Sequence, residues 1–210
     1  MAQFFSVHPE YPQPRLMKQA AEIIRAGGLV AYPTDSAYAL GGHLGDSSLL
    51  DRIRRIRQVD DRHHFTLVCR DLSEIATYAR VDNAQYRLLK AATPGSYTFI
   101  LEGSRELPRR VLHPKRKTIG LRIPDHRLVL ALLAELDEPL LSSTLILPGD
   151  EEPMTDPQEI RDRLEKRVDL VIDAGPCGAG MTTVVNLADG GAEVLRVGKG
   201  PVAPFGMAGD

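Results

Sequence analysis

The chain has 210 residues, of which 43% are hydrophobic and 26% charged, and its formal net charge is −2 at pH 7. This composition is typical of a soluble globular protein with one sizeable core, and no apolar run approaches the ~20 residues that a membrane span requires. The amino-terminal residues lack the pattern of a signal peptide, and Cys69 and Cys177 lack the spacing of a zinc site or a disulfide framework. We therefore expect a cytoplasmic protein with reduced thiols.

Apolar spacing and capping residues predict a series of helices and strands. Apolar residues recur at helical spacing over 15–25, and Pro14 suits the first position of that helix. A short apolar strand is expected over 29–32. The further elements expected are helices over 47–57, 83–92 and 125–136 and from Pro157 onward, a helix start at the capping-box spacing of 71–74, and strands over 65–69, 97–101, 118–123, 139–144, 169–175, 183–187 and 192–198.

The order of these elements favours a single domain. Helices and strands alternate over the first half of the chain, and strands dominate afterwards. This order indicates an α/β (α+β) fold on a mixed sheet of parallel and antiparallel strands flanked by helices. The domain is expected to span 1–210, with a core over about 14–200.

Polar residues gather at the ends of the predicted strands. The stretch 31-AYPTDSAYALGG-42 leaves the first strand and presents Thr34 and Asp35, and it is either a turn or the floor of a ligand site. The other polar residues at strand ends are Arg122, 142-SST-144, Thr182, Thr183 and Arg196. Hydroxyl and backbone N–H groups at strand ends hold phosphate or carboxylate, and an arginine adds a bidentate fork. Each position alone is more often an ordinary turn or sheet residue, but together they indicate a cavity for small polar and anionic ligands.

Motifs for several kinds of chemistry are missing. The sequence has no HExxH, GxSxG, paired CxxC, P-loop or Rossmann pattern, so the metalloprotease, nucleophile-elbow hydrolase and zinc-site classes have no motif support. His63 and His64 follow a predicted helix and are more typical of a solvated loop than of a metal pair. Asp35 could act as a general base, although a turn aspartate more often bonds to its own backbone. No metal-binding residue is predicted.

The charged residues are unevenly distributed. Basic residues concentrate within 52–62 and 105–117, and acidic residues within 150–159. A positive face that holds polyanions is therefore compatible with the near-neutral total. Helix surfaces and hairpin tips are often charged, so solvated surfaces are the somewhat more common explanation of such clusters, and the sequence leaves both interpretations open.

Several fragments, taken in order, resemble a known family. They are GGLVAYPTDSAYALG, IRQ, PGSYTFIL, TIGLRIP, PLLSSTLILPG, TTVVNL and LRVG, and they cover nearly the whole chain. They resemble the YrdC/YciO-like family, the threonylcarbamoyl-adenylate synthase superfamily, and most closely its YciO branch. The resemblance implies a twisted mixed sheet with a concave basic cavity for ATP, L-threonine and bicarbonate, with Mg²⁺ on the phosphates. The implied product feeds threonylcarbamoyladenosine formation on tRNA, and double-stranded RNA binding is also attributed to the fold.

The resemblance also implies roles for the matching residues. Thr34 and Tyr38 would line the amino-acid pocket, Arg122 would grip the threonine carboxylate, and Arg57 would meet the ATP phosphates. The implied catalytic residues are Arg57, Arg122 and Ser142; the implied substrate-binding residues are Thr34, Tyr38, Arg122, Ser142 and Thr144; and the implied nucleotide-binding residues are Arg57, Arg62, Ser143, Thr182, Thr183 and Arg196.

The departures from the family pattern fall on the nucleotide side. Val59 and Asp60 stand where the pattern Lys-x-Arg-Pro has its arginine and proline, and His63 replaces a following lysine. Ile146 stands at the asparagine of Ser-Thr-Ser-Ala-Asn, and Asn186 at the aspartate after Thr-Val-Val. A lost charge-assisted hydrogen bond costs ~1.5–3 kcal/mol. We therefore expect weak or redirected synthase chemistry.

Two other functions remain open. A double-stranded RNA-binding protein without synthase activity would use the basic segments 52–62 and 105–117, and its binding would fall steeply with salt. A hydrolase of a related adenylate or phosphoanhydride would use the same cavity.

Overall fold

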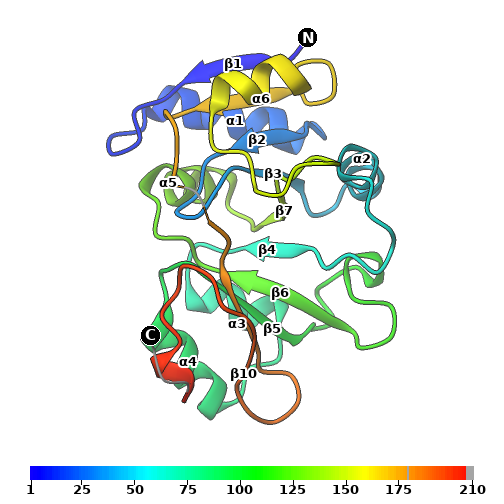
Figure 1. Ribbon diagram of the computed structural model, residues 1–210, viewed down its shortest axis with the longest axis vertical. Coiled ribbons are helices and arrows are strands. Elements are labelled where there is room, and N and C mark those ends of the chain that lie inside the picture. The colour runs from blue at the N-terminus through cyan, green and yellow to red at the C-terminus, as the bar shows by residue number, and fades with distance from the viewer. Residues whose placement is uncertain (179, 207–210) are drawn as a thin grey trace.

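Ten β-strands form one mixed sheet in the computed structural model, which describes residues 1–178 and 180–206 (Figure 1). The strands are β1 (Gln3–Ser6), β2 (Val30–Tyr32), β3 (Ala39–His43), β4 (Thr66–Val68), β5 (Tyr97–Glu102), β6 (Thr118–Arg122), β7 (Leu140–Thr144), β8 (Leu170–Asp173), β9 (Thr183–Asn186) and β10 (Glu193–Arg196). Their spatial order is β1-β8-β2-β3-β7-β4-β6-β5-β9-β10. The pairs β1/β8, β2/β8, β4/β6 and β5/β9 are parallel and the remaining pairs antiparallel, which confirms the expected mixed α/β sheet.

Six α-helices flank the sheet within the described residues. They are α1 (Pro14–Arg25), α2 (Ser47–Arg57), α3 (Leu72–Tyr78), α4 (Asn83–Ala92), α5 (Arg127–Leu136) and α6 (Pro157–Leu164). Capping side chains set several of their starts: Asp46 accepts the N–H of Ser48 at 2.8 Å before α2, and Asp82 forms a full capping box with Gln85 before α4. None of the described helices is long and apolar enough to cross a membrane.

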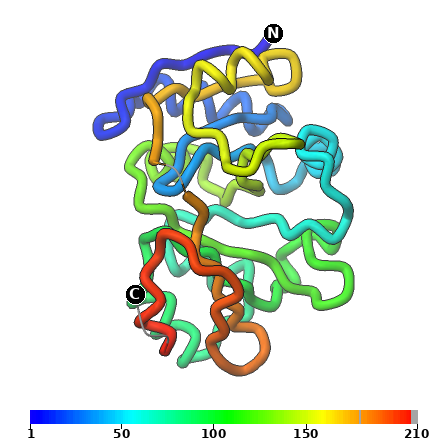
Figure 2. The backbone as a smooth tube through the Cα atoms, in the orientation of Figure 1, coloured from blue at the N-terminus to red at the C-terminus, as the bar shows by residue number. Residues whose placement is uncertain are grey.

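Apolar side chains pack on both faces of the sheet. Side chains of successive strand residues point to opposite faces, and Val30, Tyr32 and Leu140 pack with α1 and α5 on what we call the α5 face. Leu67 and Leu141 belong to the opposite cluster, which also contains apolar residues of α2, α3, α4 and α6. In Figure 2 the described residues between these strands, 174–178 and 180–182, run from the half of the sheet that holds β8 to the half that holds β9.

Helices α1 and α5 cover only part of the α5 face. The strand residues that pack beneath them belong to β2, β3, β4, β7 and β8. Further along the sheet the same face presents Thr66 on β4, Gly120 on β6, Thr98 and Ile100 on β5, and Val184 on β9. The register joins them, because Gly120 pairs with Thr66 and Ile100, and Thr98 pairs with Val184. This uncovered part of the sheet positions the candidate site.

Two strands were not expected from the sequence. Strand β1 pairs with β8 at the edge of the sheet, outside the predicted core of about 14–200. Strand β3 begins within the stretch 31–42, where two glycines interrupt the residue pattern that predicts a strand. Gly41 lies beneath the ring of Tyr32, so a Cβ there would approach Tyr32 Cε1 to 2.8 Å. The stretch is therefore a loop over 33–38 followed by a strand, and not a turn alone.

Two helix starts also differ from expectation. Asp71 caps α3 by accepting the N–H of Glu74 at 2.8 Å, but the Glu74 carboxylate accepts the N–H of Arg70, so the capping box is incomplete. Helix α5 begins at Arg127 rather than at Asp125, whose N–H donates to Asp35 at 2.9 Å. In both cases a polar group that the sequence pattern placed in the helix start forms its hydrogen bond with a residue outside the helix.

Candidate functional site

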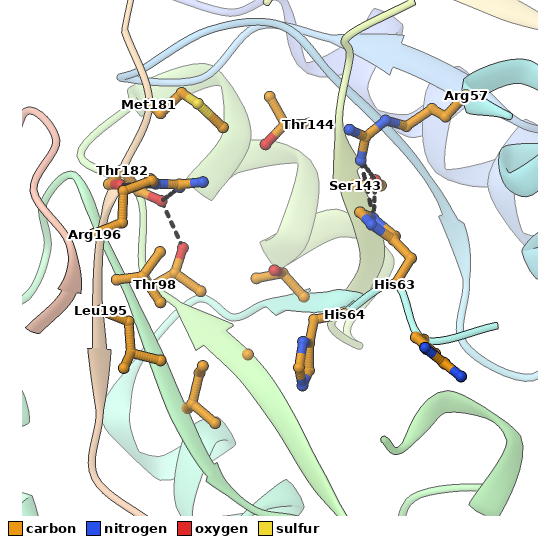
Figure 3. Close-up of a pocket in the computed structure, with 15 residues that line it drawn as sticks. Arg57, His63, His64, Thr98, Ser143, Thr144, Met181, Thr182, Leu195 and Arg196 are labelled. Carbon is orange, nitrogen blue, oxygen red and sulfur yellow. Dashed lines mark hydrogen bonds between the residues drawn. The ribbon is translucent and has the colours of Figure 1, made fainter. Parts of the chain in front are cut away.

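A cavity of about 480 Å³ lies over the uncovered part of the α5 face (Figure 3). Its floor consists of Thr66, Thr98, Ile100, Gly120 and Val184. A Cβ on Gly120 would lie 2.9 Å from Thr98 Cγ2 and 3.0 Å from Thr66 Oγ1. The glycine therefore keeps the floor open, because any side chain at that position would project between the two threonines.

One wall of the cavity is a cluster of Arg57, His63 and Ser143, which we call the Arg57 cluster (Figure 3). Arg57 is the last residue of α2, Ser143 lies on β7, and His63 lies in the loop that follows α2. Arg57 Nη1 donates to Ser143 Oγ at 2.6 Å and to His63 Nε2 at 2.9 Å, and Nε2 lies 2.9 Å from Ser143 Oγ. Because a guanidinium only donates, Nε2 is an unprotonated acceptor.

The electrostatics of the cluster agree with a neutral imidazole. Burial, and then the charge of Arg57, lower the pKa of His63 to about 4. Burial also lowers the pKa of Arg57 from its ordinary value, but an arginine stays charged in proteins. The cluster thus offers one positive charge, held in place by a hydroxyl and a neutral ring.

The opposite wall is built on Arg196 and Thr182, beside Met181 (Figure 3). Arg196, the last residue of β10, donates from Nε and Nη2 to the carbonyl oxygen of Thr182 at 3.1 and 3.0 Å. Nη2 also reaches Thr182 Oγ1 at 3.2 Å, and that hydroxyl lies 2.8 Å from Thr98 Oγ1. The guanidinium is therefore oriented by Thr182, the residue before β9, and its partners are uncharged.

Among the residues that the structure describes, the charged side chains that line the cavity are all basic: Arg57, Arg62 and Arg196. His64 also lines the cavity, and its ring stacks on that of His113 with centroids 4.8 Å apart. This contact brings the basic segment 105–117 to the edge of the cavity. The site is suited to an anion.

Arg122 lies on the same face of the sheet, two residues beyond Gly120. Its Nη2 donates to Asp35 Oδ1 and its Nη1 donates to Ser36 Oγ at 3.2 Å, while Asp35 Oδ2 accepts the N–H of Asp125 at 2.9 Å. Arg122 is 6% exposed, and its Nε has no hydrogen-bond partner among the described residues. This second cluster, the Arg122 cluster, therefore keeps one buried donor unused.

Thr34 shapes the loop that carries Asp35. Its Oγ1 donates to the carbonyl oxygen of Ala37 at 2.6 Å and accepts the N–H groups of Ser36 and Ala37 at 3.1 and 3.2 Å. The hydroxyl closes a local turn, and the turn places Asp35 against Arg122. Asp35 is thus an ion-pair partner rather than a residue that bonds only to its own turn.

The structure brings together many of the residues expected at the site. The expected residues that line the cavity are Arg57, Arg62, Ser143, Thr144, Thr182 and Arg196. Ser142 does not line it, because its Oγ lies 2.5 Å from Tyr32 Oη and 2.9 Å from the carbonyl oxygen of Leu40. Thr183 does not either, since its Oγ1 donates to the carbonyl oxygen of Gly200 at 2.6 Å.

Tyr38 lies outside the cavity as well. Its ring is fully buried in the cluster on the opposite face, and its hydroxyl donates to the carbonyl oxygen of Gly175 at 2.9 Å. Desolvation raises its pKa above the ordinary value. In this structure Tyr38, Ser142 and Thr183 serve the packing around the site, and their polar atoms are bound to protein partners.

Of the five departures from the family pattern, only His63 lines the cavity. Ile146 contributes its carbonyl oxygen, which accepts from Arg57 Nε at 3.4 Å. Asn186 turns its amide toward its own loop, donating to Asp189 Oδ2 at 2.8 Å. Val59 and Asp60 lie in the loop after α2 without lining the cavity.

Several lining residues were missed by the sequence reading, including His64, Thr66, Thr98 and Gly120. Thr66, Thr98 and Gly120 are polar or small residues within otherwise apolar strands, and that was the available signal. Their strands are distant in the sequence and meet only through the sheet order. No group of three or more His, Cys, Asp or Glu residues suited to a metal ion occurs in the part of the chain that the structure describes.

Comparisons with known proteins agree with the fold. The family model Sua5_yciO_yrdC, described as Telomere recombination, matches residues 22–198. The YciO protein of Escherichia coli (strain K12) is 56% identical over 98% of this chain and 100% of its own. Its crystal structure superposes with a TM-score of 0.94, again over 98% of this chain and 100% of that one.

Two more distant proteins carry a named activity or ligand. The threonylcarbamoyl-AMP synthase of Bacillus subtilis (strain 168) is 28% identical over 86% of this chain, which spans 52% of that protein. The crystal structure of P. abyssi Sua5 complexed with L-threonine is 24% identical, with a TM-score of 0.87 over 95% of this chain and 58% of that one, and it shows the same fold. By its sequence and its fold, the chain belongs to the Sua5/YciO/YrdC family.

Proposed function

We propose that the protein is a threonylcarbamoyl-AMP synthase-like nucleotidyltransferase of low turnover. It binds ATP, L-threonine and bicarbonate, and it acts in the formation of threonylcarbamoyladenosine on tRNA. The observation that carries the proposal is the cavity itself, in which the charged side chains are all arginines and the neighbouring groups are hydroxyls. Such a set of donors suits phosphate oxygens.

The reaction needs alignment more than a reactive side chain. The amine of threonine takes up carbon dioxide from bicarbonate as a carbamate, a carbamate oxygen attacks the α-phosphorus of ATP, and pyrophosphate leaves. Because no covalent intermediate with the protein forms, the rate depends on holding the reactants in line and on neutralising charge. Arg57 and Arg196 face the cavity from opposite walls, where they would hold the phosphate between them (Figure 3).

The two remaining parts of the ligand have matching surfaces. The nucleobase would lie against the apolar side of the cavity, formed by Ile100, Met181, Val184 and Leu195. The amino-acid carboxylate would be held at Arg122, whose Nε is the unused buried donor. The Arg122 cluster and the cavity floor share one face of the sheet, so the two ligands would approach each other there.

Low turnover follows from the Arg57 cluster. His63 stands where the family pattern has a lysine, and its imidazole is neutral because of burial and of the Arg57 charge. The wall therefore stabilises less of the negative charge that develops on the phosphates than a wall with two cations.

RNA binding is a second candidate, and one contact favours it. The stacked rings of His64 and His113 join the basic segment 105–117 to the lip of the cavity. Arginines and lysines of that segment are exposed, so a polyanion could lie across the entrance. Binding of a short RNA duplex should weaken linearly on a log-log plot against salt, and a nucleotide held inside the cavity should show a shallower slope.

The synthase proposal is tested by pyrophosphate release from ATP and bicarbonate, with and without L-threonine. The variant Arg57→Gln should abolish the threonine-dependent release, whereas Arg87→Gln, an exposed arginine on α4, should leave it unchanged. Pyrophosphate release that does not depend on threonine would contradict the proposal. So would a folded protein that releases no pyrophosphate.

A further inference from the structure

The cavity has a limited supply of positive charge. Its cations are Arg57, Arg62 and Arg196, while the imidazole of His63 is an acceptor and carries no charge. Two of the three guanidiniums are also partly occupied. Arg57 uses Nη1 and Nε on protein acceptors, and Arg196 uses Nε and Nη2 on Thr182.

The orientation of these arginines is fixed before a ligand arrives. Their partners are a hydroxyl, a neutral ring and backbone carbonyls, so their charges remain uncompensated while their positions are held. Each guanidinium keeps few N–H groups for a ligand. Two fixed guanidinium groups on opposite walls, each with some of its N–H groups already in use, can together bind one phosphate group. They suit a single phosphate better than a flexible chain of three phosphates.

A protein-held Mg²⁺ does not fit the lining residues. Mg²⁺ bound to a nucleotide is usually anchored by one or two carboxylates together with the phosphates, whereas the charged side chains that line the cavity are arginines. On the amino-acid side, the loop carboxylate of Asp35 is already bound to Arg122 and to the N–H of Asp125. The lining residues that the structure describes thus supply no carboxylate anchor for the metal that would neutralise a triphosphate.

We propose that the cavity is a site for a nucleoside monophosphate or an acyl-adenylate, which carry a single phosphate, and that it discriminates against Mg²⁺–ATP. The inference rests on the proposed function, because threonylcarbamoyl-AMP is such an adenylate. It goes further by naming the adenylate as the preferred ligand. The site would then hold the product of the synthase reaction more tightly than its nucleotide substrate.

Calorimetric titration of the full chain with AMP, ADP and ATP, each in EDTA and in excess Mg²⁺, tests the inference. We expect AMP to bind at least about tenfold more tightly than Mg²⁺–ATP, a difference of about 1.4 kcal/mol. Mg²⁺ should leave the AMP affinity unchanged. Tighter binding of ATP, strengthened by Mg²⁺, would overturn the inference and leave the proposed function standing. No binding by any of the three nucleotides would contradict both.

Two variants make the result specific to the cavity. Arg196→Gln should weaken AMP binding about tenfold or more, while Arg87→Gln, at an exposed residue that does not line the cavity, should not. His63→Lys adds a cation to the wall and should raise the affinity for ATP relative to AMP. An AMP-to-ATP ratio that does not respond to His63→Lys would show that charge supply does not set the preference, and the inference would fail.

Discussion

The two arginine clusters of the site balance their charge in different ways. In the Arg122 cluster the guanidinium is paired with the carboxylate of Asp35, and both side chains are about nine-tenths buried. In the Arg57 cluster the partners are a hydroxyl, a carbonyl and a neutral histidine. The guanidinium of the first cluster has a carboxylate partner, whereas that of the second is bound to uncharged groups. A ligand carboxylate must therefore share Arg122 with an internal anion, whereas a phosphate meets an uncompensated charge at Arg57.

The largest expected difference between the two clusters is in their contribution to the stability of the folded protein. Arg122→Met leaves Asp35 buried without its counter-ion, so the free energy of unfolding should fall by about 3–5 kcal/mol. Arg57→Met leaves only neutral groups without their partner, so the free energy of unfolding should fall by clearly less. Urea denaturation of the two variants measures the difference. Equal losses would show that the Asp35 pair is not what distinguishes the clusters.

The pH dependence of stability tests the neutral state of His63. The unfolded chain takes up a proton on this imidazole near its ordinary pKa of about 6.5, but the folded protein does so only near 4. Stability should therefore fall as the pH drops through this window, because only the unfolded state gains the proton there. The contribution has an upper bound of about 3 kcal/mol, which solvent screening reduces.

The matched variant for this measurement is His63→Gln. Urea midpoints taken between pH 7 and pH 4 should fall less steeply for the variant than for the unchanged protein, since other titrating groups are shared. Parallel curves would mean that His63 titrates normally and that the Arg57 cluster carries a second positive charge at mildly acidic pH.

A substitution in the floor of the cavity tests by steric exclusion whether the ligand binds there. Gly120→Ala places a Cβ 2.9 Å from Thr98 Cγ2 and 3.0 Å from Thr66 Oγ1, within the space above the sheet. AMP affinity should fall about tenfold. Gly191→Ala, where a Cβ meets nothing within 4 Å, is the control and should bind as before. Unchanged binding by both variants would move the ligand away from this floor.

The smallest expected effect concerns how Arg196 is oriented. Thr182→Val removes one of its acceptors but keeps the Thr182 carbonyl, so AMP affinity should fall only about two- to threefold. Thr77→Val, at an exposed threonine on α3, should not change it. A loss as large as that of Arg196→Gln would show that the hydroxyl itself contacts the ligand.

Local patterns predicted most of the elements, and the failures have identifiable causes. Asp46 and Asp82 cap α2 and α4 as expected because capping depends on neighbouring residues. Strand β3 was missed because its glycines are required by side chains of other elements that pack on them: Gly41 lies under Tyr32 of β2, and a Cβ on Gly42 would lie 2.6 Å from Leu49 Cδ1 of α2. Such demands are invisible in the sequence until the sheet order is known.

The same limit applies to the site. Strand-end reasoning located Ser143, Thr144 and Arg196, which line the cavity, but it could not separate Ser143 from Ser142. Ser142 is taken by Tyr32 Oη, a contact across 110 residues of sequence. Likewise, nothing local indicated that Asp35 would pair with Arg122, so this ion pair was found only in the structure.

A crystal structure of the protein with bound AMP tests the central claim most directly. The account predicts the phosphate between the walls of the cavity, with oxygens within hydrogen-bond distance of Arg57 or Arg196, and the base against Ile100 and Val184. AMP bound outside this cavity, or a cavity without nucleotide in crystals grown at saturating AMP, would contradict the account.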